Sequence, residues 1–306
     1  MKRIKNAPMP SAWKNYLYPT LILILLGVIW GSGYSIAKLA MANGVPPLGY
    51  AFWQSLGPAI LLSVITLLKK TKIALNKNYL IYYFICGLLA IALPNTNMYF
   101  TASHLPSGLL AIIINITPIL IYIITLGLGL ERFSVQAFAG VYLAILGIML
   151  VLIPEASLPA FSSMPWVVQA LATPLCFAVS IIYIAKKNIA HSSITQAAGM
   201  LLCSAILLIP LIISTHEFYP LTQVNLPVFL IILEIILSSL GYILLFYLLK
   251  IAGPIFYSLV SSVVALTGLF WGWLIFGERL NFWSSLAAIF IILGISLVSL
   301  QQARDK

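Results

Sequence analysis

Long apolar runs separated by short polar segments dominate the chain. Ten such runs follow one another, at 18–41, 48–68, 79–99, 106–126, 133–153, 166–187, 195–214, 226–248, 254–276 and 282–300. A helix needs ~20 mostly apolar residues to cross ~30 Å of hydrocarbon. The runs show no two-residue alternation of apolar and polar positions, which disfavours membrane-spanning β-strands. The pattern therefore predicts an all-α polytopic membrane protein with ten transmembrane helices.

The basic residues indicate how these helices are oriented, because cytoplasmic loops carry an excess of Lys and Arg. With both termini cytoplasmic, 14 of the 16 Lys and Arg residues fall in cytoplasmic segments, and the exceptions are Lys38 and Arg279. The net charge of +10 is then an orientation signal that also contacts anionic lipid. This distribution disfavours nucleic-acid binding. It predicts a multi-pass protein of the cell inner (plasma) membrane with cytoplasmic N and C termini.

The second half of the chain repeats the pattern of the first after 147 residues. Glu131-Arg132 falls on Glu278-Arg279 at this shift, and Gly147 falls on Gly294. Each unit holds five runs, and an odd number of spans makes the second unit enter the membrane from the opposite side. The sequence therefore predicts two inverted five-helix repeats, 1–153 and 154–306, as in many secondary transporters.

Composition and missing motifs exclude several classes of protein. The chain is 62% apolar and 7% charged, which leaves too few charges for a soluble fold. The three cysteines lie inside apolar runs and there are only 3 histidines, so no metal site and no cofactor are expected. The sequence has no HExxH and no GxxxxGK[ST] motif, and its one Asp is Asp305. Neither an enzyme nor an ATP-driven transporter is therefore expected.

Glu234 is the acidic residue deep within a predicted span, near the middle of the eighth run. A central charge costs ~2.5–3.5 kcal/mol on insertion scales, so such residues usually face a cavity or a partner. Burial favours the neutral, protonated carboxyl, which suits a proton-coupling site or a site for a substrate ammonium group. The alternative is a neutral carboxyl that hydrogen-bonds to a neighbouring helix.

Polar and aromatic residues recur at helical spacing on several predicted helices. Lys38 could attract a substrate carboxylate, extend to the outer headgroups or pair with Glu234. Gly27, Gly31 and Ser35 form a small-residue ridge that should pack closely on another helix. The candidate substrate-binding residues are Trp30, Tyr34, Lys38, Gln54, Asn95, Tyr99, Asn115, Tyr122, Ser238, Tyr242, Ser258 and Ser262. Each of them could instead join helices by hydrogen bonds across the bundle.

Two Glu-Arg pairs follow the fourth and ninth runs. Glu131-Arg132 and Glu278-Arg279 are expected to anchor helix ends at the membrane interface and to cap the helices that follow. Ser134 and Asn281 are the side chains expected to cap the N-termini of those helices.

The order and spacing of several motifs resemble a known family. The motifs are Trp30-Gly31-Ser32, 111–118 (AIIINITP), Glu131-Arg132, 247–254 (YLLKIAGP) and 276–280 (FGERL). Over essentially its whole length the chain resembles the ten-helix EamA-type transporters of the drug/metabolite transporter superfamily. The resemblance implies a proton- or gradient-driven exporter of small organic metabolites.

The candidate residues offer one base, one acid, amides and aromatic rings, a mixture that fits amino acids or related compounds. We therefore expect a secondary active exporter of such metabolites that works by alternating access, with proton coupling as an option. An exporter of cationic amphiphilic drugs is the alternative, and a channel or membrane scaffold is less favoured. The expected partners are a small-molecule substrate and membrane lipid, and the expected state is a monomer or weak homodimer.

Overall fold

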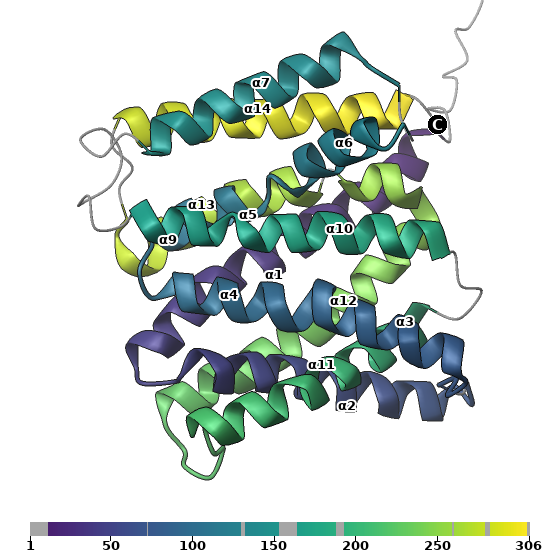
Figure 1. Cartoon of the computed structure of the whole chain (residues 1–306), viewed down its shortest axis with the longest axis vertical. Coiled ribbons are helices and arrows are strands. Elements are labelled where there is room, and N and C mark those ends of the chain that lie inside the picture. The colour runs from purple at the N-terminus through teal and green to yellow at the C-terminus, as the bar shows by residue number, and fades with distance from the viewer. Residues whose placement is uncertain are drawn as a thin grey trace, which may run out of the picture.

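The computed structural model describes residues 12–71, 73–129, 132–152, 164–187, 193–258, 260–278 and 282–304, and every regular element among them is helical. Figure 1 shows the helices lying side by side, with their axes across the molecule. They are α1 (Ala12–Ala42), α2 (Pro47–Leu68), α3 (Lys77–Gly87), the π-helical turn η1 (Leu88–Ala92), α4 (Leu93–Ala102), α5 (Ser107–Ile114), α6 (Thr117–Gly127), α7 (Val135–Leu152), α9 (Met164–Ala170), α10 (Ala172–Lys187), α11 (Ser193–Thr215), α12 (Leu226–Ser258), α13 (Val260–Phe276) and α14 (Phe282–Arg304).

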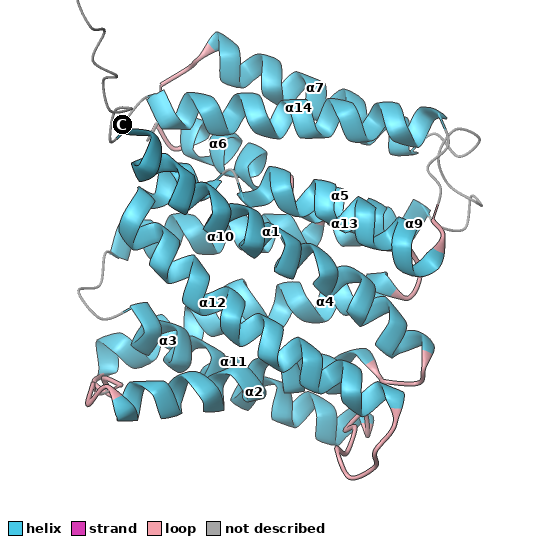
Figure 2. Ribbon diagram, turned by 180° about the vertical axis from the view of Figure 1, so that it is seen from behind, coloured by secondary structure: helices cyan, strands magenta, loops and turns pink. Residues whose placement is uncertain are grey.

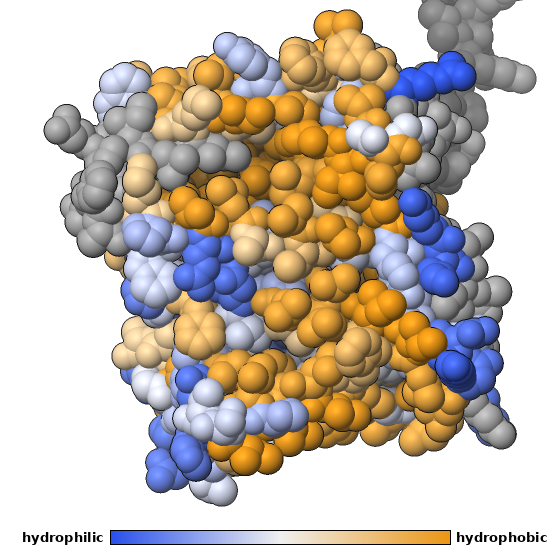
Figure 3. All heavy atoms as spheres, in the orientation of Figure 1, coloured by the Kyte–Doolittle hydropathy of each residue, from blue (hydrophilic) through white to orange (hydrophobic). Residues whose placement is uncertain are grey.

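The helices have the length and the surface of a polytopic membrane protein. Seven segments of the described chain are long and apolar enough to cross a membrane, and three shorter apolar helices accompany them. Large apolar side chains such as Leu67, Ile213 and Phe229 are exposed on the outer faces of the helices. Figure 3 shows apolar residues over the middle of one face and polar residues gathered where the helices end. A surface of this kind suits a hydrocarbon environment and not water.

Proline explains three interruptions of the predicted helices. The third run contains the π-helical turn η1, the fourth breaks at Asn115-Ile116, and the sixth breaks at Leu171. Pro94, Pro118 and Pro174 follow these three places within a few residues. Proline has no N–H to bond to the carbonyl four residues earlier, and its ring collides with that carbonyl. The fourth and sixth runs are therefore each built from two helices, and the third consists of α3, η1 and α4 in succession.

The connection predicted between the eighth and ninth runs, at 249–253, is wrong. Residues 249–253 lie inside α12, which continues to Ser258. A turn there would expose backbone donors and acceptors, whereas a continuous helix satisfies them internally, which a low-polarity environment favours. The Gly253-Pro254 pair therefore does not end the helix.

The small-residue ridge of α1 packs against α13, as predicted. A Cβ added to Gly31 would collide with the hydroxyl of Thr267, and one added to Gly27 would collide with the side chain of Val263. The Thr267 hydroxyl donates a hydrogen bond to the carbonyl of Gly27 at 2.7 Å. This close approach places the later turns of α1 beside α5 and the end of α13.

Two further contacts position the interior of the bundle. Seen from behind, α12 lies between α1 and α2 (Figure 2). Helices α7 and α14 form a pair at one side of the molecule (Figure 1), where a Cβ on Gly140 would lie 2.8 Å from the carbonyl oxygen of Gly294. Helix α12 thus packs between α1 and α2, and α4 packs against both α1 and α2.

Candidate functional site

Glu234 lies inside the bundle, where α12 packs between α1 and α2. Its side chain is buried, and the Ser238 hydroxyl one turn later donates to Oε1 at 2.8 Å. The other oxygen, Oε2, is buried without a hydrogen-bond partner. Gly33 of α1 lies next to the carboxyl and has no side chain to cover it. A Cβ at this position would lie 3.5 and 3.6 Å from the two carboxyl oxygens, which is van der Waals contact. One carboxyl oxygen is therefore unused inside the bundle.

A chain of amide hydrogen bonds connects Glu234 to two other helices. The Gln54 amide of α2 donates to the Ser238 hydroxyl at 3.4 Å. The Asn95 amide of α4 donates to the Gln54 oxygen at 2.9 Å. Since Ser238 in turn donates to Glu234, a continuous chain of hydrogen bonds joins the carboxyl on α12 to α2 and α4.

Aromatic residues surround the same carboxyl. Tyr50, Tyr99 and Tyr242 lie close enough to interact electrostatically with Glu234. The rings of Tyr50 and Tyr99 meet edge to face, with centroids 4.7 Å apart. Tyr242 meets the Trp30 ring at 6.5 Å. The Tyr50 hydroxyl, like Glu234 Oε2, is buried without a partner. We call Glu234 and these neighbours the Glu234 cluster; its members are Trp30, Gly33, Tyr50, Gln54, Asn95, Tyr99, Glu234, Ser238 and Tyr242.

A second polar pair extends the Glu234 cluster toward the break between α5 and α6. Asn115 donates to the Tyr34 hydroxyl at 3.0 Å and to the Ala111 carbonyl at 2.7 Å. Tyr34 interacts electrostatically with Tyr99. The predicted residues of the first, fourth and eighth runs therefore meet in one region of the bundle.

Lys38 lies elsewhere and does not pair with Glu234. Its Nζ is 2.6 Å from Oε1 of Glu278, and this is the ion pair found among the described residues. Glu278 also accepts hydrogen bonds from the Ser107 and Gly108 backbone N–H groups at 2.9 and 3.1 Å, and from the Ser107 hydroxyl at 3.1 Å. The Lys38 ammonium also lies 4.9 Å from the centre of the Phe276 ring. We call the group of Lys38, Glu278, Ser107 and Gly108 the Lys38–Glu278 closure, because it joins the ends of α1, α13 and α5.

Glu278 also has a role that the sequence did not predict. It caps the N-terminus of α5, because the free N–H groups of the first α5 turn attract an anion. Burial raises the pKa of Glu278, but the bonds from Lys38, Ser107 and Gly108 outweigh it and leave the pKa below its ordinary value. Glu278 is therefore a carboxylate at physiological pH.

Some predicted residues do not join the Glu234 cluster. Tyr122 accepts from the Ser134 N–H at 3.0 Å and thereby holds the start of α7. Ser134 also caps α7, as predicted, since its hydroxyl accepts from the Ala137 N–H at 3.4 Å. Ser262 lies 3.4 Å from the Ser296 hydroxyl and joins α13 to α14. The side chain of Ser258 and the residues Glu131, Arg279 and Asn281 lie outside what the structure describes.

Sequence reasoning missed Tyr50, which is among the most deeply buried side chains of the protein. A signal was present, because Tyr50 stands four residues before Gln54 and so shares its face of the helix. The partnership of Lys38 and Glu278 has no such signal, since 240 residues separate the two.

Comparison with known proteins identifies the family to which this chain belongs. The model of the EamA-like transporter family matches residues 18–153 and again 164–300, so the chain belongs to this family of membrane transporters. A curated relative is the uncharacterized transporter YvbV of Bacillus subtilis (strain 168), which is 27% identical over 254 residues, or 80% of this chain and 81% of YvbV. A solved crystal structure with 17% identity superposes with a TM-score of 0.63 over 94% of this chain and 99% of its own, which shows the shared fold.

Proposed function

We propose that the protein is a secondary active transporter that exports small organic metabolites, with amino acids or related compounds as the substrate class. The observation that carries this proposal is the Glu234 cluster. It combines a buried carboxyl that has an unused oxygen with amide, hydroxyl and aromatic groups. Polar groups of this kind are costly inside a membrane bundle and mark substrate or ion pathways.

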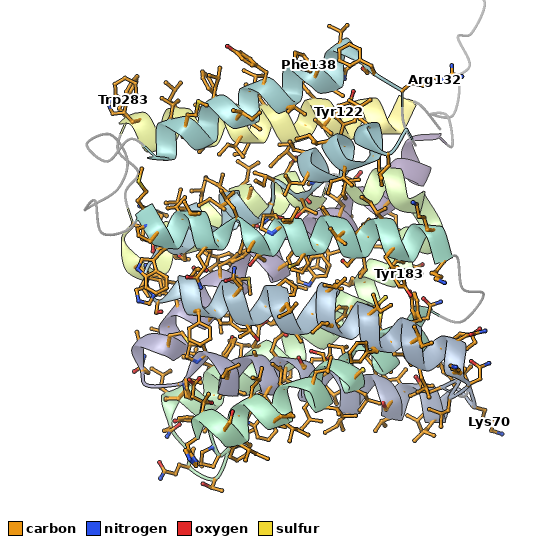
Figure 4. All side chains as sticks on the ribbon, viewed as in Figure 1. Lys70, Tyr122, Arg132, Phe138, Tyr183 and Trp283 are labelled. Atoms are coloured by element: carbon orange, nitrogen blue, oxygen red, sulfur yellow. The ribbon has the colours of Figure 1, made fainter. Side chains whose placement is uncertain are left out.

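In this proposal, ten helices cross the inner membrane as two inverted repeats, 1–153 and 154–306. The seven long and three shorter apolar segments coincide with the ten runs of the sequence, and two successive family matches support the two units. Figure 4 shows Lys70 and Arg132 at the same end of the bundle. We assign this basic end to the cytoplasm, because positive residues remain on that side.

Alternating access follows from the position of the Lys38–Glu278 closure. With the basic end cytoplasmic, Lys38 and Glu278 lie at the outer ends of their helices. The closure joins α1 and α5 of the first unit to α13 of the second, and so holds the two units together on the outer side. Export requires the units to separate there, which breaks these contacts and lets the Glu234 cluster open outward.

Glu234 is the proposed proton-coupling residue. A carboxylate buried without a cation is unfavourable, so the empty site retains a proton. The titratable groups that face Glu234 are Tyr50, Tyr99 and Tyr242, and α1 presents Gly33 to it. An incoming substrate cation can replace the proton, and this exchange would couple export to proton entry.

Transport into proteoliposomes tests the proposed function. The purified protein is reconstituted and offered a panel of amino acids, amines and nucleosides, with and without an imposed pH gradient. We expect saturable uptake of a panel member, stimulated by the gradient and by the same compound on the opposite side of the membrane. A substrate that leaks at channel-like rates, without such exchange, would contradict alternating access.

A further inference from the structure

Two buried polar atoms of the Glu234 cluster are without a hydrogen-bond partner, and their side chains lie close enough to interact electrostatically. They are Oε2 of Glu234 and the hydroxyl of Tyr50. Glu234 is 8% exposed and Tyr50 is 1% exposed, so bulk water does not satisfy them in this conformation. Buried polar atoms are nearly always hydrogen-bonded in native proteins, and each exception needs an explanation. A ligand that donates to both oxygens explains this pair.

The surrounding groups favour a positive charge on that ligand. Tyr50 and Tyr99 present their rings and hydroxyls next to Glu234, and Tyr242 with Trp30 continues the aromatic wall. Aromatic faces attract cations, and a carboxylate attracts them more strongly in a dry environment than in water. An ammonium group carries three donors, which fits a carboxylate oxygen, a tyrosine hydroxyl and one further oxygen of the cluster.

No described side chain of the Glu234 cluster carries a positive charge that could neutralise a substrate carboxylate. Lys38 was the candidate for this task, but its ammonium is engaged by Glu278 at 2.6 Å and faces the Phe276 ring. A carboxylate next to the bound ammonium would also approach Glu234 itself and be repelled. The site therefore favours the ammonium group of an amino acid and disfavours its carboxylate.

We propose that the substrate is an organic amine, with a protonated amino group on an aromatic or apolar body and no carboxylate on the same carbon. The inference rests on the proposed export function and narrows its substrate class to the amines related to amino acids, so free amino acids are excluded. The ammonium binds between Glu234 and Tyr50, and the body lies against Tyr99, Tyr242 and Trp30. Amines are the decarboxylated counterparts of amino acids, so the class of reaction that supplies such a substrate is amino-acid decarboxylation.

Gly33 offers a way to test the position of the ammonium without disturbing the fold. A Cβ at this residue would lie 3.5 Å from Oε1 and 3.6 Å from Oε2 of Glu234, an ordinary contact distance. Gly33→Ala therefore fits the structure yet fills the bare face of the carboxyl. Glu234→Gln keeps an oxygen for the Ser238 hydroxyl but removes the charge that attracts the amine.

The experiment compares three compounds that share one ring. Tyramine has the amino group alone, tyrosine has both groups, and 3-(4-hydroxyphenyl)propionate has the carboxylate alone. Uptake into proteoliposomes is measured by mass spectrometry, with protein-free liposomes correcting for leakage. We expect tyramine to enter at least about tenfold faster than tyrosine, a factor equal to about 1.4 kcal/mol, and the propionate not to enter. Tyramine should also raise the thermal unfolding midpoint of the purified protein.

Variants decide whether any preference arises at the Glu234 cluster. Gly33→Ala and Glu234→Gln should each lower tyramine uptake and remove its thermal stabilisation, whereas Glu217→Gln, which changes a glutamate bonded to the Leu48 N–H away from the cluster, should retain both. Tyrosine uptake equal to or faster than that of tyramine would overturn the inference, as would unchanged tyramine uptake in Glu234→Gln. A protein that ignores all three compounds but carries other metabolites overturns this inference and leaves the proposed function intact. A protein that carries nothing across the wider panel fails the proposed function itself.

Discussion

Replacing Glu278 with Gln should weaken the Lys38–Glu278 closure and shift the protein toward an outward-open state. A Gln oxygen in the place of Oε1 can still accept from Lys38 and the Ser107 N–H, but an NH₂ group in the place of Oε2 cannot accept from the Gly108 N–H or the Ser107 hydroxyl. Hydrogen bonds to a charged group contribute ~1.5–3 kcal/mol. Lys38 is 24% exposed and Glu278 is 14% exposed, so water screens part of this interaction. We expect the closed state to lose about 2 kcal/mol, which raises the open-to-closed ratio about 30-fold.

Cysteine labelling in cells can measure this shift. Ser35 is buried and lies directly next to the closure, with its hydroxyl 3.1 Å from that of Ser107. Ser35→Cys, in a background in which the three native cysteines are replaced, provides a near-isosteric reporter. A membrane-impermeant maleimide added outside reaches this position only when the closure opens, so the labelling rate follows the open population.

The control for this experiment is Glu217→Gln in the same Ser35→Cys background. This substitution also removes one glutamate charge, but at a residue that is not part of the Lys38–Glu278 closure. Glu217 accepts from the Leu48 N–H at 3.3 Å and has no contact with Lys38 or Glu278 among those observed. We expect it to leave the labelling rate near that of the parent. Equal rates in the parent and in Glu278→Gln would refute the role of the closure as the outer barrier.

Three further outcomes are expected. The ratio of the Ser35→Cys labelling rates in Glu278→Gln and in the parent should be constant between about pH 6 and 8, because the pH dependence of the thiol cancels in the ratio and the pKa of Glu278 is lowered, so that its stabilising contribution disappears only as the pH falls through that lowered value; a marked change of this ratio within the range would contradict the assignment. Gly31→Ala, which collides with the Thr267 hydroxyl, should lower the free energy of unfolding by about 1–3 kcal/mol, with Gly33→Ala nearly neutral in the same thermal unfolding assay. Tyr122→Phe should cost about 1–2 kcal/mol of stability because the Ser134 N–H loses its acceptor, and it should leave transport per folded molecule unchanged.

Periodicity and residue type were enough to predict much of the fold. Apolar length predicted the helical segments, of which seven are long enough to cross a membrane and three are shorter, and the small-residue spacing of Gly27 and Gly31 predicted a close helix contact that α13 provides. The effect of a proline was harder to predict, because the same residue type acts differently in different helices. Pro58 and Pro210 remain inside continuous helices, whereas Pro118 follows a break. Neighbouring helices decide whether the freed carbonyl finds another partner.

Residue type and helical spacing predicted most members of the candidate site, but they did not predict which side chains pair across helices. Glu234, Ser238 and Tyr242 recur every four residues on α12, and their alignment is visible in the sequence. Lys38 has a suitable charge to pair with Glu234, but it pairs with Glu278 instead. Glu278 lies next to Lys38 because it also accepts the free N–H groups at the start of α5. Helical spacing in the sequence specifies which residues share one face of a helix. The packing of the other helices determines which side chains contact that face.

The central claim is that Glu234 is the coupling residue of an alternating-access carrier. Its most direct test is substrate uptake by wild-type and Glu234→Gln proteoliposomes, measured side by side over a range of imposed pH gradients, with Glu217→Gln as the control. The account predicts that the gradient accelerates uptake in the wild type and in Glu217→Gln, and that Glu234→Gln loses this dependence. Uptake by Glu234→Gln at the wild-type rate, with the same dependence on the pH gradient, would contradict it.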